Sequence, residues 1–279
     1  MLIGIILGLS IFVAINITHI WRILTTLANY LPVLVSPAIL LQLTILIIIV
    51  ATSKIFTKIK LRQLGLFNME YLFQGLFVFV LISIFIQFTQ ICNRWFIKGN
   101  MNWMFQHSEI DIKNWIHSNV EFFLVGFHEE LLFRVVIFLC LYKWLAIRFK
   151  GKHQNLLLLS VLLSQIIFSL YHFPLEIIAN KQSVGILIEG FLRRLMAGLL
   201  LLFAYIRTRN LYVPIFIHLL IDFHIPLFYN ETSMLLEGAN LVQFYSILLL
   251  IFWPKLFTQA KPYVQSEELP LSYNKDKIV

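Results

Sequence analysis

Residues 122–141 read FFLVGFHEELLFRVVIFLCL, an almost continuous apolar run that carries two adjacent glutamates and an arginine near its centre. About 20 apolar residues in a helix span the hydrocarbon core of a bilayer. Ionisable side chains are costly there, and those that occur face the interior of a helix bundle or a water-filled cavity. The stretch therefore predicts a membrane-spanning helix with a polar side formed by Glu129, Glu130 and Arg134.

The whole chain shares the apolar character of this stretch. Of its 279 residues, 59% are hydrophobic and only 13% are charged, whereas soluble domains carry about 25% charged residues. We expect an all-α fold, a polytopic transmembrane helical bundle. Apolar periodicity and length predict about eight spans, at residues 1–18, 33–52, 71–93, 118–141, 155–173, 183–206, 211–228 and 240–257.

The chain divides into three regions by the content of these spans. Residues 1–117 hold N-terminal spans with no diagnostic motif, residues 118–228 hold the polar groups discussed below, and residues 229–279 hold the last span and a polar tail. The first span lacks a basic leader and a small-residue cleavage site, so we expect it to be retained. Residues 99–117 mix Trp, Met and Ile with charged residues, which predicts an amphipathic segment in the membrane interface.

The basic residues between the spans predict the orientation of the chain. Most Lys and Arg outside the spans lie on the side of the N-terminus, in residues 54–62, 143–152, 207–209 and 255–277. Cytoplasmic loops carry an excess of such residues. We therefore expect a multi-pass protein of the plasma membrane with both termini in the cytoplasm. The net charge of +8 is assigned to these loops, so the expected partner is the lipid bilayer and no nucleic acid is expected.

The two glutamates are expected to differ in role. Glu130 and Arg134 are four residues apart, so they share a helix face and can pair, which offsets the desolvation of both groups. Glu129 is rotated by about 100° from its neighbour and is less well placed to share that arginine. We expect Glu130 to be the structural partner of Arg134 and Glu129 to hold and deprotonate a water molecule.

Two further spans carry polar side chains. In FSLYHFP (168–174), His172 follows Phe168 by four residues, and Pro174 is expected to disturb the helix just beyond. In VPIFIHLLIDF (213–223), His218 and Asp222 share a helix face. Asp222 can accept a hydrogen bond from the His218 ring and fix its tautomer, or it can present its own acid group to a substrate carbonyl.

Each feature alone has an ordinary structural explanation, but together they indicate a reaction site. A single glutamate–arginine pair also serves as a clamp or a transport element, and a single histidine near a helix end is usually a satisfied polar residue. An acid, two histidines and a further acid on three spans can converge in one cavity, and such a set of groups is typical of a reaction site. With both termini in the cytoplasm, however, His172 lies in the outer half of its span while Glu129 and His218 lie nearer the midplane. This mismatch requires a tilted span, a cavity that reaches both depths, or a different topology.

Span 183–206 contains a second charged motif, IEGFLRRL (188–195). Glu189 and Arg193 are again four residues apart and can pair. Arg194 faces elsewhere and can meet Asp222, Glu129 or a substrate carboxylate. We favour the simpler interpretation, in which Arg194 is solvated at the wall of a water-filled vestibule.

Three of these motifs, in this order on separate apolar helices, resemble the CAAX protease and bacteriocin-processing (CPBP) family, also called the Abi family of intramembrane proteases. They are the double glutamate with its arginine, Phe-x-x-x-His, and His-x-x-x-Asn/Asp. The resemblance covers roughly residues 118–225. This chain carries Asp at position 222, where many members of the family carry Asn. An ionised aspartate, unlike asparagine, cannot donate a hydrogen bond to an oxyanion.

The resemblance implies an intramembrane endopeptidase that hydrolyses a peptide bond in a small membrane-associated protein or peptide precursor, such as that of a bacteriocin. By this analogy Glu129 and His172 activate the attacking water. His218 and Asp222 stabilise the oxyanion or orient the substrate carbonyl. The remaining pair, Glu130 and Arg134, supports the site.

The need for a metal stays open in this interpretation. The reaction requires either no cofactor or a divalent metal such as zinc, for which Glu129, His172 and His218 would be the ligands. The sequence HEELL (128–132) imitates only the start of the HExxH zinc motif, because position 132 is Leu.

Two non-enzymatic functions are compatible with the same residues. A membrane immunity or sensor protein can bind a peptide or membrane partner through such a cavity without chemistry, since a fold does not fix a function. An ion-coupled transporter can use intramembrane acids, although the internal repeats typical of such proteins are not visible in the sequence.

Overall fold

The computed structural model describes residues 11, 19–26, 28, 36–56, 68–98, 112–149, 153–222 and 233–256, and their regular secondary structure is entirely helical. The prediction of an all-α fold is confirmed for this part of the chain. The predicted first span apart from Ile11, most of the predicted interfacial segment and the tail lie outside the described residues. The named elements are α2 (Pro37–Phe56), α3 (Met69–Lys98), α4 (Ile112–Glu130), η3 (Leu131–Ile137), α5 (Phe138–Arg148), α6 (His153–Tyr171), η4 (Leu175–Ala179), α7 (Val184–Thr208), α8 (Tyr212–Asp222) and α9 (Ser233–Leu256).

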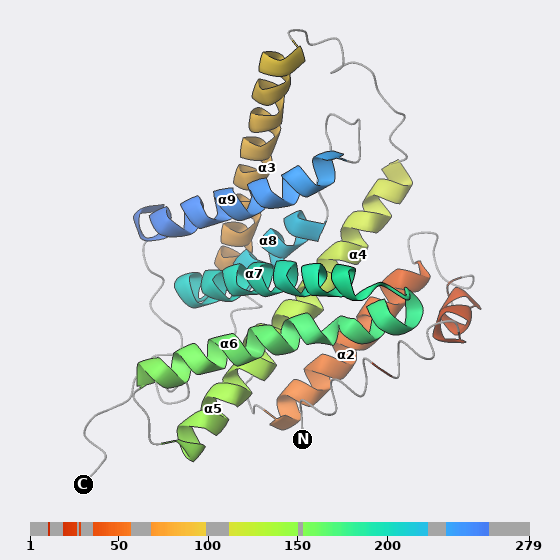
Figure 1. The fold of residues 1–279 in the computed structure, drawn as a ribbon, viewed down its shortest axis with the longest axis vertical. Coiled ribbons are helices and arrows are strands. Elements are labelled where there is room, and N and C mark those ends of the chain that lie inside the picture. Colours follow the sequence, from red (N-terminus) through yellow and green to blue (C-terminus); the bar gives the residue numbers. More distant parts are fainter. Residues whose placement is uncertain are drawn as a thin grey trace.

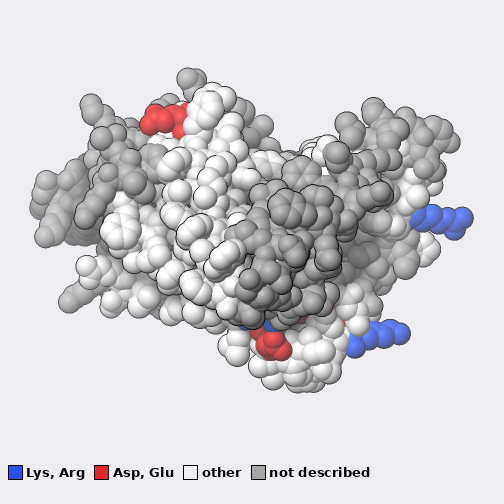
Figure 2. Space-filling view, turned by 90° about the horizontal axis from the view of Figure 1, so that it is seen from above, with Lys and Arg blue, Asp and Glu red and all other residues white. Residues whose placement is uncertain are grey.

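Within the part of the chain that the structure describes, two helical stretches are long and apolar enough to cross a membrane, Met69–Cys92 and Gln154–Ile178. Large apolar side chains are exposed along α3, α6 and α7, for example Phe73, Ile84, Phe88, Leu158, Ile188 and Met196. Figure 2 shows that uncharged side chains make up most of the described surface on the face it presents. A surface of this kind suits lipid, whereas the number of eight spans stays a prediction.

Helix α8 lies at the centre of the described bundle, where it packs against α3, α4, α7 and α9. Its residues from Val213 to Leu220 are all buried. A helix that is apolar on every side needs such a surrounded position. The apolar character of α8 therefore places His218 in the interior of the bundle. Helices α6 and α7 run across the direction of α3 (Figure 1).

The run from α4 to α5 is one continuous helical path with a π-helical section, η3, in its middle. All seven residues of η3 are buried, and at its end the N–H of Phe138 donates to the carbonyl of Phe133, five residues back. Helix α4 packs on α2 and α8, while α5 packs on α6. Short π-helical sections are rare in proteins, and many of those that occur lie at functional sites. Here the section begins directly after Glu129 and Glu130.

Helix α6 ends one residue before His172. The chain makes a turn there, and Pro174 leads into the π-helical η4. The N–H of Glu176 still donates to the carbonyl of His172, at 3.2 Å, and that of Asn180 donates to Leu175, at 3.1 Å. The predicted disturbance at Pro174 is confirmed. His172 thus sits at the junction of two helical segments, where its ring can leave the α6 surface.

Asn210 connects the start of α8 to α3. Its Oδ1 accepts from the N–H of Tyr212 at 2.9 Å, which caps the helix. Its Nδ2 donates to the carbonyl of Tyr71 at 2.9 Å and to Oε1 of Gln74 at 3.1 Å. A fully buried side chain therefore satisfies both of its polar ends and fixes α8, with His218, relative to α3.

Gly126 allows α4 to approach α8 closely. A Cβ atom at this position would lie 3.4 Å from the carbonyl oxygen of Ile215 and 3.5 Å from Cβ of His218. Such an atom would make ordinary van der Waals contact with α8, so Gly126 marks a close approach of the two helices. The close approach occurs one turn before the two glutamates and brings them to His218.

Candidate active site

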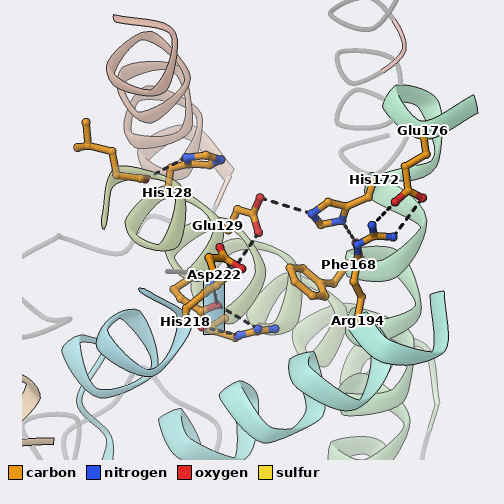
Figure 3. Close-up of polar contacts among 11 residues, drawn as sticks. His128, Glu129, Phe168, His172, Glu176, Arg194, His218 and Asp222 are labelled. Carbon is orange, nitrogen blue, oxygen red and sulfur yellow. Dashed lines mark hydrogen bonds and ion pairs between the residues drawn. The ribbon is translucent and has the colours of Figure 1, made fainter. Parts of the chain in front are cut away.

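Three separate elements bring four polar side chains to one place (Figure 3). Glu129 comes from the end of α4, His172 from the turn after α6, and His218 and Asp222 from α8. The carboxylate of Glu129 lies between the two rings, with Oε1 3.6 Å from Nε2 of His172 and Oε2 3.8 Å from Nε2 of His218. The structure therefore brings together the four residues that the sequence singled out as catalytic candidates.

Glu130 and Arg134 form the expected pair, and it is fully buried. Nε of Arg134 donates to Oε2 of Glu130 at 2.7 Å, and Nη2 donates to Oε1 at 3.1 Å. Both side chains are 0% exposed. Nη1 donates to Oε1 of Gln165 on α6, at 2.8 Å. Because bidentate pairing fixes geometry as well as charge, this group ties α4 and η3 to α6 beneath the site.

Glu130 also holds one of the histidines. Its Oε1 lies 3.0 Å from Nδ1 of His218, and since an ionised carboxylate only accepts, Nδ1–H is the donor. The Nε2 atom of the same ring then faces Asp222, whose Oδ2 is 3.2 Å away. The sequence offered Asp222 two roles, either the fixing of this tautomer or the presentation of its own acid group to a substrate carbonyl. The structure assigns the fixing of the tautomer to Glu130 because the helix crossing puts Glu130 against Nδ1.

The backbone fixes the tautomer of His172. Its Nδ1 lies 3.0 Å from the carbonyl oxygen of Phe168, which can only accept, so Nδ1 carries the proton. In the neutral ring the lone pair of Nε2 points to Glu129 (Figure 3). The separation of 3.6 Å is too long for a direct hydrogen bond. It suits a water molecule that bonds to both groups.

The site is open on the side of His172. The side chain of His172 is 24% exposed, whereas those of Glu129 and His218 are 8% and 7% exposed. The ring of His172 is therefore partly accessible, while Glu129 is sheltered by the bundle. Helix α6 runs across the direction of α3 (Figure 1), and the turn after it brings His172 next to Glu129.

Phe168 forms an aromatic wall shared by two of the motifs. Its ring packs edge-on against His172, with centroids 5.2 Å apart, and against Phe133 of η3, at 4.9 Å. The guanidinium carbon of Arg134 lies 5.2 Å from the centre of the same ring. A cation over an aromatic face is attracted by the ring, so Phe168 links the buried ion pair to the exposed histidine.

The donors do not converge as a metal site would require. His172 and His218 meet different oxygens of Glu129, and no group of three or more His, Cys, Asp or Glu among the described residues is arranged to hold a metal ion. Zinc sites need at least three protein ligands at about 2.0–2.3 Å from one point. These residues therefore do not fit a zinc ion, and we derive no step through a metal.

His128 lies beside this site without taking part in it. It is buried, and its Nδ1 donates to the carbonyl of Leu124 at 3.1 Å, one turn back on α4. Figure 3 shows its ring directed away from the space between Glu129 and His172. Its contacts are those of a buried structural residue of α4.

Sequence reasoning missed two contributors and misplaced a third. Gln165 is a polar residue in an apolar span, which was a usable signal. Glu176 was not considered. Arg194, which we expected to be solvated, donates with Nη1 to Oε2 of Glu176 at 3.2 Å and with Nη2 to its other oxygen. The two partners are 18 residues apart and lie on different helices, so no local spacing revealed the pair.

Comparison with known proteins gives one match. Residues 112–224 match the family described as Type II CAAX prenyl endopeptidase Rce1-like, which is part of the CPBP family. The match covers all the candidate site residues and confirms the resemblance drawn from the three motifs. No curated protein and no solved structure matches the chain.

Proposed function

We propose that this chain is an intramembrane endopeptidase whose Glu129 and His172 activate the attacking water. The premise is that residues 112–224 belong to the CPBP family of membrane-embedded CAAX-type proteases. The family supports proteolysis in the membrane, and the mechanism and the substrate are our proposal. We expect the substrate to be a peptide or a small membrane-associated protein precursor. We also propose that the chain spans the plasma membrane several times with both termini in the cytoplasm.

The observation that carries this proposal is the gap between Glu129 and His172. The two groups face each other at 3.6 Å, and the backbone bond to Phe168 leaves Nε2 of His172 as an acceptor. A water molecule in that gap can donate one proton to each group, which aims a lone pair of its oxygen outward. Positioned general bases of this kind contribute about 10²–10⁴-fold to a rate.

The hydrolytic step follows from these positions. Glu129 takes a proton from the water as the water oxygen bonds to the carbonyl carbon of the substrate, and the electron pair of the C=O bond moves to oxygen. When the intermediate collapses, the C–N bond breaks and the leaving nitrogen takes the proton back from Glu129. The same carboxyl thus serves first as base and then as acid, with His172 orienting the water.

His218 is the proposed donor to the oxyanion. Its Nδ1–H is held by Glu130, and a ring that also carries a proton on Nε2 can donate to a developing negative charge. Asp222, 3.2 Å from Nε2, supports that protonation and keeps the ring in place. An ionised Asp222 cannot itself donate, so in this proposal it acts through the ring of His218.

A cleavage assay with purified protein tests the proposal. Wild type, Glu129→Gln and His172→Ala are offered a mixed pool of short membrane-peptide precursors in detergent, and products are read by mass spectrometry. We expect cleavage by wild type and a loss of at least about 100-fold in both variants. Glu121→Gln, two turns earlier on the same helix, is the matched control and should cleave as wild type does.

Two further arms of this assay decide the alternatives. Because the donors do not fit a zinc ion, wild-type cleavage should persist with a strong chelator, and a chelator-sensitive rate would contradict this reading of the site. Equal cleavage by wild type and both site variants would refute the mechanism. A different result would identify a non-catalytic immunity or sensor protein. In that case nothing is cut, yet the Glu129→Gln variant rescues the defect of a strain that lacks this protein.

A further inference from the structure

A second ion pair lies one turn beyond His172, outside the motifs described above. Glu176 is the second residue of η4, and its N–H donates to the carbonyl of His172 at 3.2 Å. Its carboxylate faces Arg194, on the neighbouring helix α7 (Figure 3). A displacement of η4 is therefore transmitted directly to the backbone of His172.

The geometry of this pair is that of a two-point clamp. Two guanidinium nitrogens of Arg194 meet the two carboxylate oxygens of Glu176, and a planar fork of this kind fixes direction as well as distance. The side chain of Glu176 is 9% exposed and that of Arg194 is 26% exposed. The pair is sheltered enough to keep one arrangement, whereas exposed pairs exchange among many.

Two other contacts hold the same junction. The ring of Phe173, next to His172, packs edge-on against Phe191 of α7, with centroids 6.0 Å apart. Gly190 leaves space for the clamp, since a Cβ atom there would lie 3.2 Å from Nη1 of Arg194. Both contacts lie within one helical turn of Arg194, so this part of α7 is shaped to receive the chain that follows α6.

The chain that follows His172 is not a regular α-helix. It leaves α-helical geometry at His172, passes through Pro174 and the π-helical η4, and takes a positive φ of 50° at Lys181. The ring of His172 is held from α6 by its hydrogen bond to Phe168 and by edge-on contacts with Phe168 and Tyr171. The docking of η4 on α7 holds the other side, the backbone that follows the ring.

We propose that the Glu176–Arg194 pair is a positioning device, which fixes η4 against α7 and keeps Nε2 of His172 at water-sharing distance from Glu129. This inference rests on the proposed proteolytic function. Neither residue touches the reacting atoms. A buried ion pair adds little net stability over apolar packing, so the expected effect of this pair is on geometry, and displacements of about 1 Å in a reacting group lower rates by about 100-fold.

Kinetics of variants in the purified full chain test the inference. The substrate is the peptide that wild type cuts in the precursor pool, and kcat and KM are measured separately. Glu176→Gln and Arg194→Gln should lower kcat by about 10–100-fold with little change in KM, because the reacting geometry is lost rather than the binding surface. Arg194→Lys, which keeps the charge and loses the fork, should fall between these variants and wild type.

The chain offers a matched control on the same helix. Glu189 and Arg193 also form an ion pair, but their side chains are 68% and 55% exposed and they belong to α7 alone. Glu189→Gln and Arg193→Gln should keep the wild-type kcat. The exchanged double variant, Glu176→Arg with Arg194→Glu, should recover most of the kcat lost by the single variants, which a general loss of stability would not allow.

Hydrogen exchange of the η4 amides gives a readout that needs no substrate. Arg194→Gln should speed exchange in residues 172–180 by about tenfold or more, while Arg193→Gln should leave it unchanged. Wild-type kcat and exchange in Arg194→Gln would overturn the inference, as would equal losses in the Arg193 control. If wild type cuts and Glu129→Gln does not, such a result refutes only the positioning role. If Glu129→Gln cuts normally, the proposed function itself fails.

Discussion

The molecule contains two glutamate–arginine pairs with the same four-residue spacing in opposite surroundings. Glu130 and Arg134 are both 0% exposed at the centre of the bundle, while Glu189 and Arg193 are 68% and 55% exposed on α7. The spacing makes both pairs form, because residues four apart lie on one helix face. It does not decide what either pair does.

The surroundings make the difference between the pairs. The buried arginine has a third partner in Gln165, and the buried glutamate has a second one in His218. The exposed pair closes only on itself within α7. A buried charge must find a partner for each of its polar atoms or destabilise the fold, so the central pair recruits α6 and α8. An exposed pair is satisfied by water.

The largest effect should come from removing the buried cation. Arg134→Met leaves the carboxylate of Glu130 buried without its counter-charge, which should lower the free energy of unfolding by about 3–5 kcal/mol. Unfolding by a denaturing detergent in mixed micelles measures this. Arg193→Met, the exposed counterpart, should stay within about 0.5 kcal/mol of wild type. Equal losses in the two variants would erase the distinction between the pairs.

A smaller loss should follow from removing the third partner alone. Gln165→Leu leaves Nη1 of Arg134 without its acceptor and should cost about 1.5–3 kcal/mol, the range for a hydrogen bond to a charged group. The control is Ser160→Ala. It removes a buried hydroxyl on α6 that donates to the carbonyl of Leu156 in the same helix. If this control costs as much as Gln165→Leu, the network adds nothing to ordinary burial.

Packing around the buried pair gives the next test. A Cβ atom on Gly198 would lie 2.4 Å from Oε1 of Gln165 and 2.9 Å from Cδ1 of Phe168. Gly198→Ala must therefore displace both side chains, and overpacking of this kind costs about 1–3 kcal/mol. Gly185, on the same helix, has nothing within 4 Å of such an atom. Gly185→Ala should be neutral or slightly stabilising, and a comparable loss there would point to the helix rather than to the network.

The smallest effect belongs to the exposed pair. A double-mutant cycle of Glu189→Gln and Arg193→Gln should give a coupling energy of about 0.3–0.5 kcal/mol. That coupling should vanish near 1 M salt, where the screening length is only about 3 Å. The corresponding cycle for Glu130 and Arg134 should be insensitive to salt. A coupling in the exposed pair that survives 1 M salt would contradict the assignment of its surroundings.

Hydropathy predicted the helices well where each apolar run forms one straight segment. The span predicted at 183–206 is α7 (Val184–Thr208), and the span at 155–173 is α6 (His153–Tyr171) followed by η4. The span predicted at 118–141 is part of a longer path that includes the π-helical η3. Nothing in the composition of LLFRVVI distinguishes a π-helical from an α-helical section.

The site could be predicted as far as its local relations reach. Helical periodicity alone indicated that Glu130 pairs with Arg134 and that His218 shares a face with Asp222, and both contacts are present. Helical periodicity could not predict the contacts between different helices. The bonds of Glu130 to His218, across 88 residues, and of Arg194 to Glu176 depend on helix crossings, which periodicity does not encode. The roles of these residues in catalysis stay a prediction.

The π-helical section has a consequence for tolerance of insertions and deletions. Each residue in an α-helix advances the side chains by about 100°, so the length of η3 sets the angular phase between α4 and α5. Loss of one residue in this section would turn Glu129 away from His172 unless α5 turned on α6 instead. The number of residues in η3, and not only their identity, therefore sets the rotation of α4 relative to α5.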